Sequence, residues 1–149
     1  MEHALAALFD LYEALDRCGP GSDVATRQAL AACDGLPAQA RVVDFGCGPG
    51  PSTLALARAG HRVTAIDGHA PFLDTLRRRA AEAGVADRVT AAVGDMAQPD
   101  LPDQAFDLVW SEGAAYSVGV PTALAAWRRL VPPGGWLAFS ELCWRTAEP

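Results

Sequence analysis

The sequence has no long apolar segment and no cluster of basic residues. Half of its 149 residues are apolar, yet no apolar run approaches the roughly 20 residues that a membrane-spanning helix needs. Residues 1–3 lack the basic start that is typical of a signal peptide. The net charge is −6, and the basic run at residues 77–79 falls in an expected helix, where consecutive side chains point in different directions. These absences predict a cytoplasmic protein that binds neither membranes nor nucleic acid.

Patterns typical of metal sites are missing as well. The four cysteines are scattered and form no Cys-x-x-Cys pair, and the histidines at positions 3, 61 and 69 have no ligand spacing. We therefore expect no metal, although spacing does not test carboxylate ligands for magnesium. We interpret the cysteines as reduced thiols of a cytosolic protein. The chain is long enough for one domain with a real core.

Segments that suit strands alternate with segments that suit helices from residue 41 onward. The expected strands cover residues 41–45, 62–66, 89–93, 106–110 and 136–140. The expected helices between them cover residues 51–59, 71–83 and 121–130. Because parallel strands need crossover connections, this alternation predicts a parallel sheet covered by helices on both faces.

Two more helices are expected before the first strand. Leucines at helical spacing mark the first at residues 4–15, and Ser22 or Asp23 caps a second that runs to about residue 33. The glycines and proline of residues 18–22 separate the two helices. We expect residues 1–39 to pack on or cap a ligand site, and residues 40–149 to form the ligand-binding domain.

The strongest motif follows the first expected strand and reads Asp-Phe-Gly-Cys-Gly-Pro-Gly from Asp44 to Gly50. Glycines let the backbone turn sharply beside a ligand, and open α/β sheets bind ligands at the carboxyl ends of their strands. A dinucleotide motif would need its third glycine at Pro51. S-adenosylmethionine has no phosphate, and its amino group suits the acidic Asp44. The motif therefore favours S-adenosylmethionine over NAD, with a glycine turn that binds nothing as the remaining alternative.

Acidic residues also follow the second and third expected strands. Asp67 comes about 20 residues after the glycines, the spacing at which an acid meets ribose hydroxyls, although it could instead cap the next helix. After the third strand, Asp95 could accept a hydrogen bond from the amine of adenine, and Met96 could pack on the ring. The fourth strand leads into Ser111 and Glu112, which could face a methyl acceptor or cap a turn.

A general base is needed only if the acceptor must lose a proton before it is methylated. Glu112 and Tyr116 are the candidate catalytic residues for that step. His69 is a third candidate, although a loop histidine near the ribose is the more typical role for this position.

These motifs, taken in order, resemble the class I S-adenosylmethionine-dependent methyltransferases, as does the Pro-Pro-Gly-Gly turn at residues 132–135. Residues 19–27 and 110–116 resemble a bacterial subgroup that methylates small molecules. The resemblance implies a three-layer Rossmann-like α/β sandwich with strand order 3-2-1-4-5, and methyl transfer to a small-molecule acceptor. Together, motifs and resemblance give this set of cofactor-binding residues: Asp44, Gly46, Cys47, Gly48, Asp67, Gly68, Asp95, Met96, Ser111 and Arg27.

The resembled proteins continue beyond the fifth strand to seven strands, whereas this chain stops at Pro149. We therefore expect a chain that lacks the last two strands, binds S-adenosylmethionine, transfers methyl groups poorly and self-associates through its apolar fifth strand. Two alternatives stay open: a non-catalytic S-adenosylmethionine-binding module or fragment, and an NAD-dependent oxidoreductase, which Pro51 disfavours.

Overall fold

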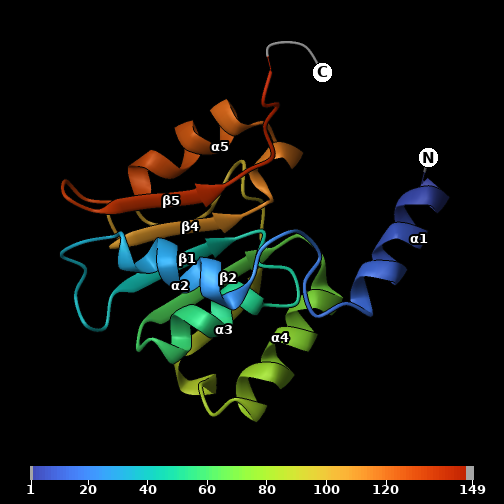
Figure 1. The fold of residues 1–149 in the computed structure, drawn as a ribbon, viewed down its shortest axis with the longest axis horizontal. Helices are drawn as coiled ribbons and strands as arrows, with labels where there is room; N and C mark the ends of the chain where they lie inside the picture. Colours follow the sequence, from blue (N-terminus) through green and yellow to red (C-terminus); the bar gives the residue numbers. More distant parts are fainter. Residues whose placement is uncertain (1, 147–149) are drawn as a thin grey trace.

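Five parallel strands form one sheet in the computed structural model, which describes residues 2–146 and the side chains from residue 7 onward (Figure 1). The strands are β1 (Arg41–Phe45), β2 (Arg62–Asp67), β3 (Val89–Val93), β4 (Leu108–Glu112) and β5 (Trp136–Ser140). Their order is β3-β2-β1-β4-β5, and every neighbouring pair is parallel. The predicted fold class and strand order are confirmed.

Helices cover both faces of this sheet. The helices that do so are α2 (Asp23–Ala31), α3 (Pro51–Arg58), α4 (Ala70–Glu82) and α5 (Val120–Trp127), whereas α1 (Glu2–Glu13) extends away from the sheet (Figure 1). Short 3₁₀ turns cover Ala86–Arg88, Ala115–Ser117 and Arg128–Leu130. Helices α3 and α4 pack with Val42 and Leu108 on one face, whereas α5 packs with Val43 and Val109 on the other. Because β1 is covered on both faces, all of its residues except Arg41 are buried.

The fourth strand begins two residues later than the predicted range of 106–110, at Leu108. Phe106 and Asp107 belong to the preceding connection, where the Asp107 carboxylate accepts the backbone N–H of Arg41 at 2.8 Å and pairs with its guanidinium at 3.0 Å. The prediction was therefore wrong at this boundary. The correction matters for function because it places Ser111 and Glu112 inside the strand and not in a loop after it.

Helix ends also differ from the expected ranges. The first helix ends at Glu13 and the second at Ala31, each two residues before its predicted end. The helix predicted at residues 121–130 begins at Val120 and changes to a 3₁₀ turn after Trp127. Such tightening of a last turn is common, because the final carbonyl groups have no partners within an α-helix.

Candidate functional site

The glycine loop, residues 46–50, connects β1 to α3 at the carboxyl edge of the sheet. Gly46, Gly48 and Gly50 have φ values of 64°, 54° and 92°, which residues with a side chain rarely adopt. A Cβ atom on Gly46 would lie 2.3 Å from the Cβ of Ala114, and one on Gly50 would lie 2.2 Å from a methyl group of Leu76. These two glycines therefore allow close packing within the protein.

Gly48 differs from the other two glycines of the loop. The nearest atom to a Cβ placed there is the sulfur of Cys18, at 3.9 Å. The glycine loop is thus tightly packed at both ends and has room at its centre.

Asp44, the last but one residue of β1, is 1% exposed. Its Oδ2 accepts hydrogen bonds from the hydroxyls of Ser52 at 3.0 Å and Thr53 at 2.6 Å, whereas its buried Oδ1 has no partner. Burial raises the pKa of Asp44 to about 7, against the opposing effect of the two hydroxyl groups. A buried carboxylate with a free oxygen would gain strongly from a cationic donor placed beside it.

Asp67, at the end of β2, connects the glycine loop to the turn that follows β2. Its Oδ2 accepts the backbone N–H of Gly48 at 2.8 Å, and its Oδ1 accepts that of His69 at 2.9 Å. Each carboxylate oxygen has room for a second hydrogen bond, so both can still accept from hydroxyl groups. Gly68 is exposed between these two contacts, and a Cβ there would meet nothing within 4 Å.

The third strand leads into Asp95 and Met96. Asp95 is exposed, and its Oδ1 accepts the backbone N–H of Ala97 at 2.7 Å. The methyl carbon of Met96 lies 3.0 Å from the position of a Cβ on Gly46. The structure therefore brings Met96 to the glycine loop, and it leaves the second carboxylate oxygen of Asp95 available.

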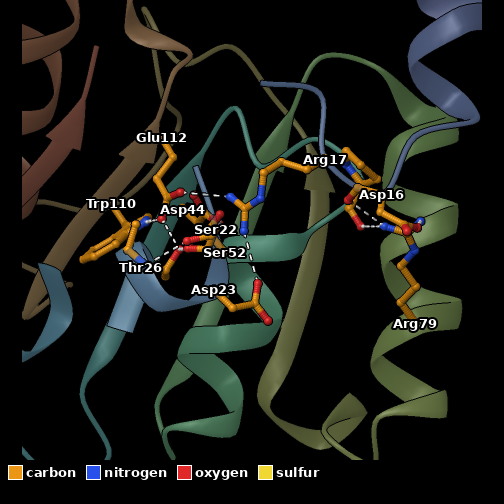
Figure 2. Close-up of polar contacts among 12 residues, drawn as sticks. Asp16, Arg17, Ser22, Asp23, Thr26, Asp44, Ser52, Arg79, Trp110 and Glu112 are labelled. Carbon is orange, nitrogen blue, oxygen red and sulfur yellow. Dashed lines mark hydrogen bonds and ion pairs between the residues drawn. The ribbon is translucent and has the colours of Figure 1, made fainter. Parts of the chain in front are cut away.

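Glu112, at the end of β4, accepts hydrogen bonds from three side chains (Figure 2). The guanidinium of Arg17 lies 3.0 Å from Oε2, while the hydroxyl of Thr26 lies 2.6 Å and the indole N–H of Trp110 lies 3.0 Å from Oε1. The Glu112 side chain is 14% exposed. Arg17, Thr26 and Trp110 therefore hold the Glu112 carboxylate in place, and Oε2 keeps room for one more hydrogen bond.

Residues 13–21, which we call the strap, are tied to the carboxyl edge of the sheet by several contacts. Besides the Arg17–Glu112 pair, Glu13 lies 2.6 Å from the ring of His69. Asp16 lies 2.6 Å from Arg79 of α4 (Figure 2). Cys18 lies opposite Gly48. Arg17 was missed by sequence reasoning because it belongs to no motif, and its partner Glu112 is 95 residues away.

The remaining candidate residues lie in different environments. The Ser111 hydroxyl is fully buried and donates to the carbonyl of Phe45 at 3.0 Å, so it joins two strands. Cys47 is buried, and burial together with nearby Asp44 and Asp67 raises the pKa of its thiol well above the ordinary value. Arg27 is exposed on α2. Tyr116 is 66% exposed beyond β4.

A cavity of about 610 Å³ lies between the strap and α2 on one side and β4 and β5 on the other. No residue of the glycine loop lines it, but Cys18, which does, lies opposite Gly48. The cavity is also lined by Glu112 and Tyr116. Its position at the carboxyl ends of the strands is the usual place for ligands in an open α/β sheet.

Two further findings concern the described residues as a whole. Within residues 2–146, no group of three or more His, Cys, Asp or Glu side chains is arranged to hold a metal ion. None of the helices in this part of the chain is both long and apolar enough to cross a membrane.

A parallel sheet of order 3-2-1-4-5 with a glycine loop after β1 and an acid at the end of β2 is common to class I methyltransferases and dinucleotide-binding proteins, so the family is identified by comparison of the sequence. The family model described as a methyltransferase domain matches residues 42–135. The chain therefore belongs to this family of class I methyltransferases.

Individual relatives are similar over most of this chain. Dimethylglycine N-methyltransferase of Parasynechococcus marenigrum is 35% identical, over 80% of this chain and 44% of its own length. A ubiquinone biosynthesis O-methyltransferase of Paracidovorax citrulli is 38% identical, over 73% and 47%. The structure of a Thiobacillus denitrificans methyltransferase in complex with S-adenosylhomocysteine has a TM-score of 0.78 and 29% identity, over 93% of this chain and 56% of that one. The chain spans less than half the length of these curated relatives.

Proposed function

We propose that this chain binds S-adenosylmethionine at the glycine loop and takes part in methyl transfer to a small-molecule acceptor. The observation that carries the proposal is the buried Oδ1 of Asp44, which has no partner and belongs to the strand that enters the glycine loop. An unpaired buried acceptor is costly, and the amino group of S-adenosylmethionine is a donor of the required charge.

Other residues fit the remaining parts of this cofactor. The free acceptor positions of Asp67 suit the two ribose hydroxyls, and those of Asp95 suit the amine of adenine. Met96 offers an apolar surface for the ring. Among the described residues, only the sulfur of Cys18 lies within 4 Å of a Cβ placed on Gly48, so a ligand can approach the backbone there. In this proposal Cys47 and Gly68 contact the cofactor through their backbone atoms.

S-adenosylmethionine, when bound, supplies a methyl group that is already activated on a sulfonium. The protein then has to align the acceptor and exclude water, and the strap is placed to help exclude water from the glycine loop. If the acceptor must lose a proton, Glu112 and Tyr116 are the candidate bases, and both line the cavity. His69 is the third candidate, and one nitrogen of its ring already contacts Glu13. Arg27 and Ser111 remain proposed cofactor-binding residues, and no contact with a particular part of the cofactor is assigned to them.

The proposed location is the cytoplasm, which rests on the composition and on the free cysteines of the described residues. The relatives named above are methyltransferases for small molecules, which supports an acceptor of that kind.

Calorimetric titration of the chain with S-adenosylmethionine and, separately, with NADH tests the cofactor. We expect saturable binding of S-adenosylmethionine only. Incubation with a labelled methyl donor and a panel of small-molecule acceptors then tests transfer, and labelled product is the expected result. Binding of NADH alone would refute the proposal. Binding of S-adenosylmethionine with no labelled product from any acceptor would favour a non-catalytic module.

Replacement of Gly48 by alanine should weaken S-adenosylmethionine binding at least tenfold. Its φ of 54° costs an alanine about 1 kcal/mol, and the methyl group would project into the free centre of the loop. Gly84→Ala is the matched control, since Gly84 has a φ of 69° and nothing within 4 Å of its would-be Cβ. Calorimetry and thermal melting should show similar small losses of stability for both variants, but lost affinity only for Gly48→Ala. Equal affinities would mean that no ligand occupies this loop.

A further inference from the structure

The cavity between the strap and the β4–β5 pair has a largely apolar wall. Tyr12, Trp110, Phe139 and Leu142 line it, together with Tyr116. Its volume of about 610 Å³ is in the range of sites that bind small organic molecules. Phe139 and Leu142 are 40% and 79% exposed, so the cavity opens to solvent beside β5, the edge strand of the sheet (Figure 1). A hydrophobic ligand could enter there.

The described residues that line the cavity include acidic residues but no basic residue. Among the described residues that line it, the two carboxylates are Glu112 and Glu141, and none is an arginine or histidine. Glu112 is paired with Arg17. Glu141 accepts the backbone N–H groups of Tyr116 at 2.8 Å and Leu142 at 3.1 Å. Within residues 2–146 the ion pairs do not include Glu141, which leaves one uncompensated negative charge in an apolar wall.

Such a wall discriminates between ligands by their charge. A carboxylate or phosphate would bring a like charge to Glu141, while a neutral molecule would gain only from the apolar surface. An ammonium group would neutralise Glu141 and could also lie against the exposed ring of Tyr116.

We infer that this cavity binds an apolar small molecule that carries an ammonium group, with the cation at Glu141 and the hydrophobic body against Phe139 and Leu142. The inference rests on the proposed function, because Cys18 lines the cavity and also lies opposite Gly48, so that the cavity would be the acceptor site. It concerns recognition, with Glu141 as the residue that determines specificity, and assigns no atom to methylation.

The test uses three ligands with one hydrophobic body: 4-phenylbutylamine, 4-phenylbutanol and 4-phenylbutyrate. Calorimetric titration of the full chain should give an affinity for the amine about fivefold higher than for the alcohol, and the lowest affinity for the carboxylate. In Glu141→Gln the three affinities should converge to within about twofold, with the alcohol unchanged. Glu82→Gln, an exposed glutamate on α4, should behave as the wild-type chain.

Equal or tighter binding of the carboxylate, or no binding of any of the three ligands, would overturn the inference. So would an unchanged amine preference in Glu141→Gln when circular dichroism shows the fold intact. The same samples are titrated with S-adenosylmethionine, which separates the two proposals. If S-adenosylmethionine binds and the amine does not, only the inference fails, whereas loss of S-adenosylmethionine binding removes the proposed function itself.

Discussion

Replacement of Asp44 by asparagine should stabilise the fold at alkaline pH and at the same time weaken S-adenosylmethionine binding tenfold or more. Burial raises the pKa of Asp44 from 3.8 to about 7, so the folded chain favours the protonated acid. The unfolded chain releases this proton near pH 3.8 and the folded chain only near pH 7. The contribution of Asp44 to stability is therefore fully present below about pH 4 and is lost as the pH rises through 7.

The size of the effect follows from the width of that pH range. Each pKa unit corresponds to about 1.4 kcal/mol, so the stability advantage of Asp44→Asn over the wild-type chain should be roughly 2–3 kcal/mol larger at pH 8 than at pH 5. The amide of asparagine leaves an unpaired N–H₂ group at the Oδ1 position, which costs about 1–3 kcal/mol at every pH. The pH-dependent difference is thus the decisive quantity.

Urea denaturation of both proteins at pH 5 and pH 8 measures this difference. His61 acts in the opposite direction, because burial lowers the pKa of its imidazole and stability is lost as the pH falls below about 6.5. That contribution is common to both proteins and cancels. Asp100→Asn, a change at an exposed aspartate, is the control. If the free energy of unfolding changed with pH in the same way for Asp44→Asn and the wild-type chain, ionisation of Asp44 would cost the fold no stability.

The loss of affinity for S-adenosylmethionine and the gain in stability at alkaline pH have the same origin, which is the missing negative charge at position 44. The asparagine carries no charge for the amino group of S-adenosylmethionine, and a hydrogen bond to a charged group contributes about 1.5–3 kcal/mol, or roughly ten- to hundredfold in affinity. A variant that is stabilised at pH 8 but binds as tightly as the wild-type chain would remove Asp44 from the cofactor site.

The local sequence was sufficient to predict most of the sheet. Residues 42–45 are an apolar run with one acid, followed directly by glycines, and this pattern has few interpretations other than a buried strand and a loop. The order 3-2-1-4-5 follows from the resemblance of the successive motifs. The start of β4 was not predictable in this way. Phe106 and Asp107 look like strand residues, and only the contact between Asp107 and Arg41, which are far apart in the sequence, shows that they precede the strand.

The surroundings of the candidate site were predicted less completely than the fold. They too depend on contacts between residues that are far apart in the sequence. The positions of residues at strand ends, such as Asp44 and Asp67, could be predicted because topology alone brings them to one edge. Side-chain partners could not, since Glu112 has three donors from the strap, α2 and β4 that no motif connects. Likewise, Gly46 and Gly50 belong to a ligand-binding motif, yet their lack of a side chain is required by Ala114 and Leu76.

Replacement of Glu112 by glutamine should loosen the strap at Arg17 and destabilise the fold by about 1–3 kcal/mol. The side-chain carbonyl of glutamine can still accept from Thr26 and Trp110, but its amide would point a donor at the guanidinium of Arg17. Freed of this partner, Arg17 keeps only the longer contact to Asp23, at 3.2 Å. The peptide bond after Arg17 should then become several times more sensitive to trypsin.

Urea denaturation and limited trypsin digestion of Glu112→Gln, Arg17→Gln and the double variant measure this effect. Because the two side chains are in direct contact, their losses should not add, and a coupling energy of about 1–2 kcal/mol is expected. Asp74→Asn, which removes an exposed pair with Arg77, is the matched control and should cost less than about 0.5 kcal/mol. If Glu112 were instead the general base, Glu112→Gln would slow methyl transfer while stability and tryptic cleavage after Arg17 stayed unchanged. That combination would refute the role of Glu112 as the anchor of the strap.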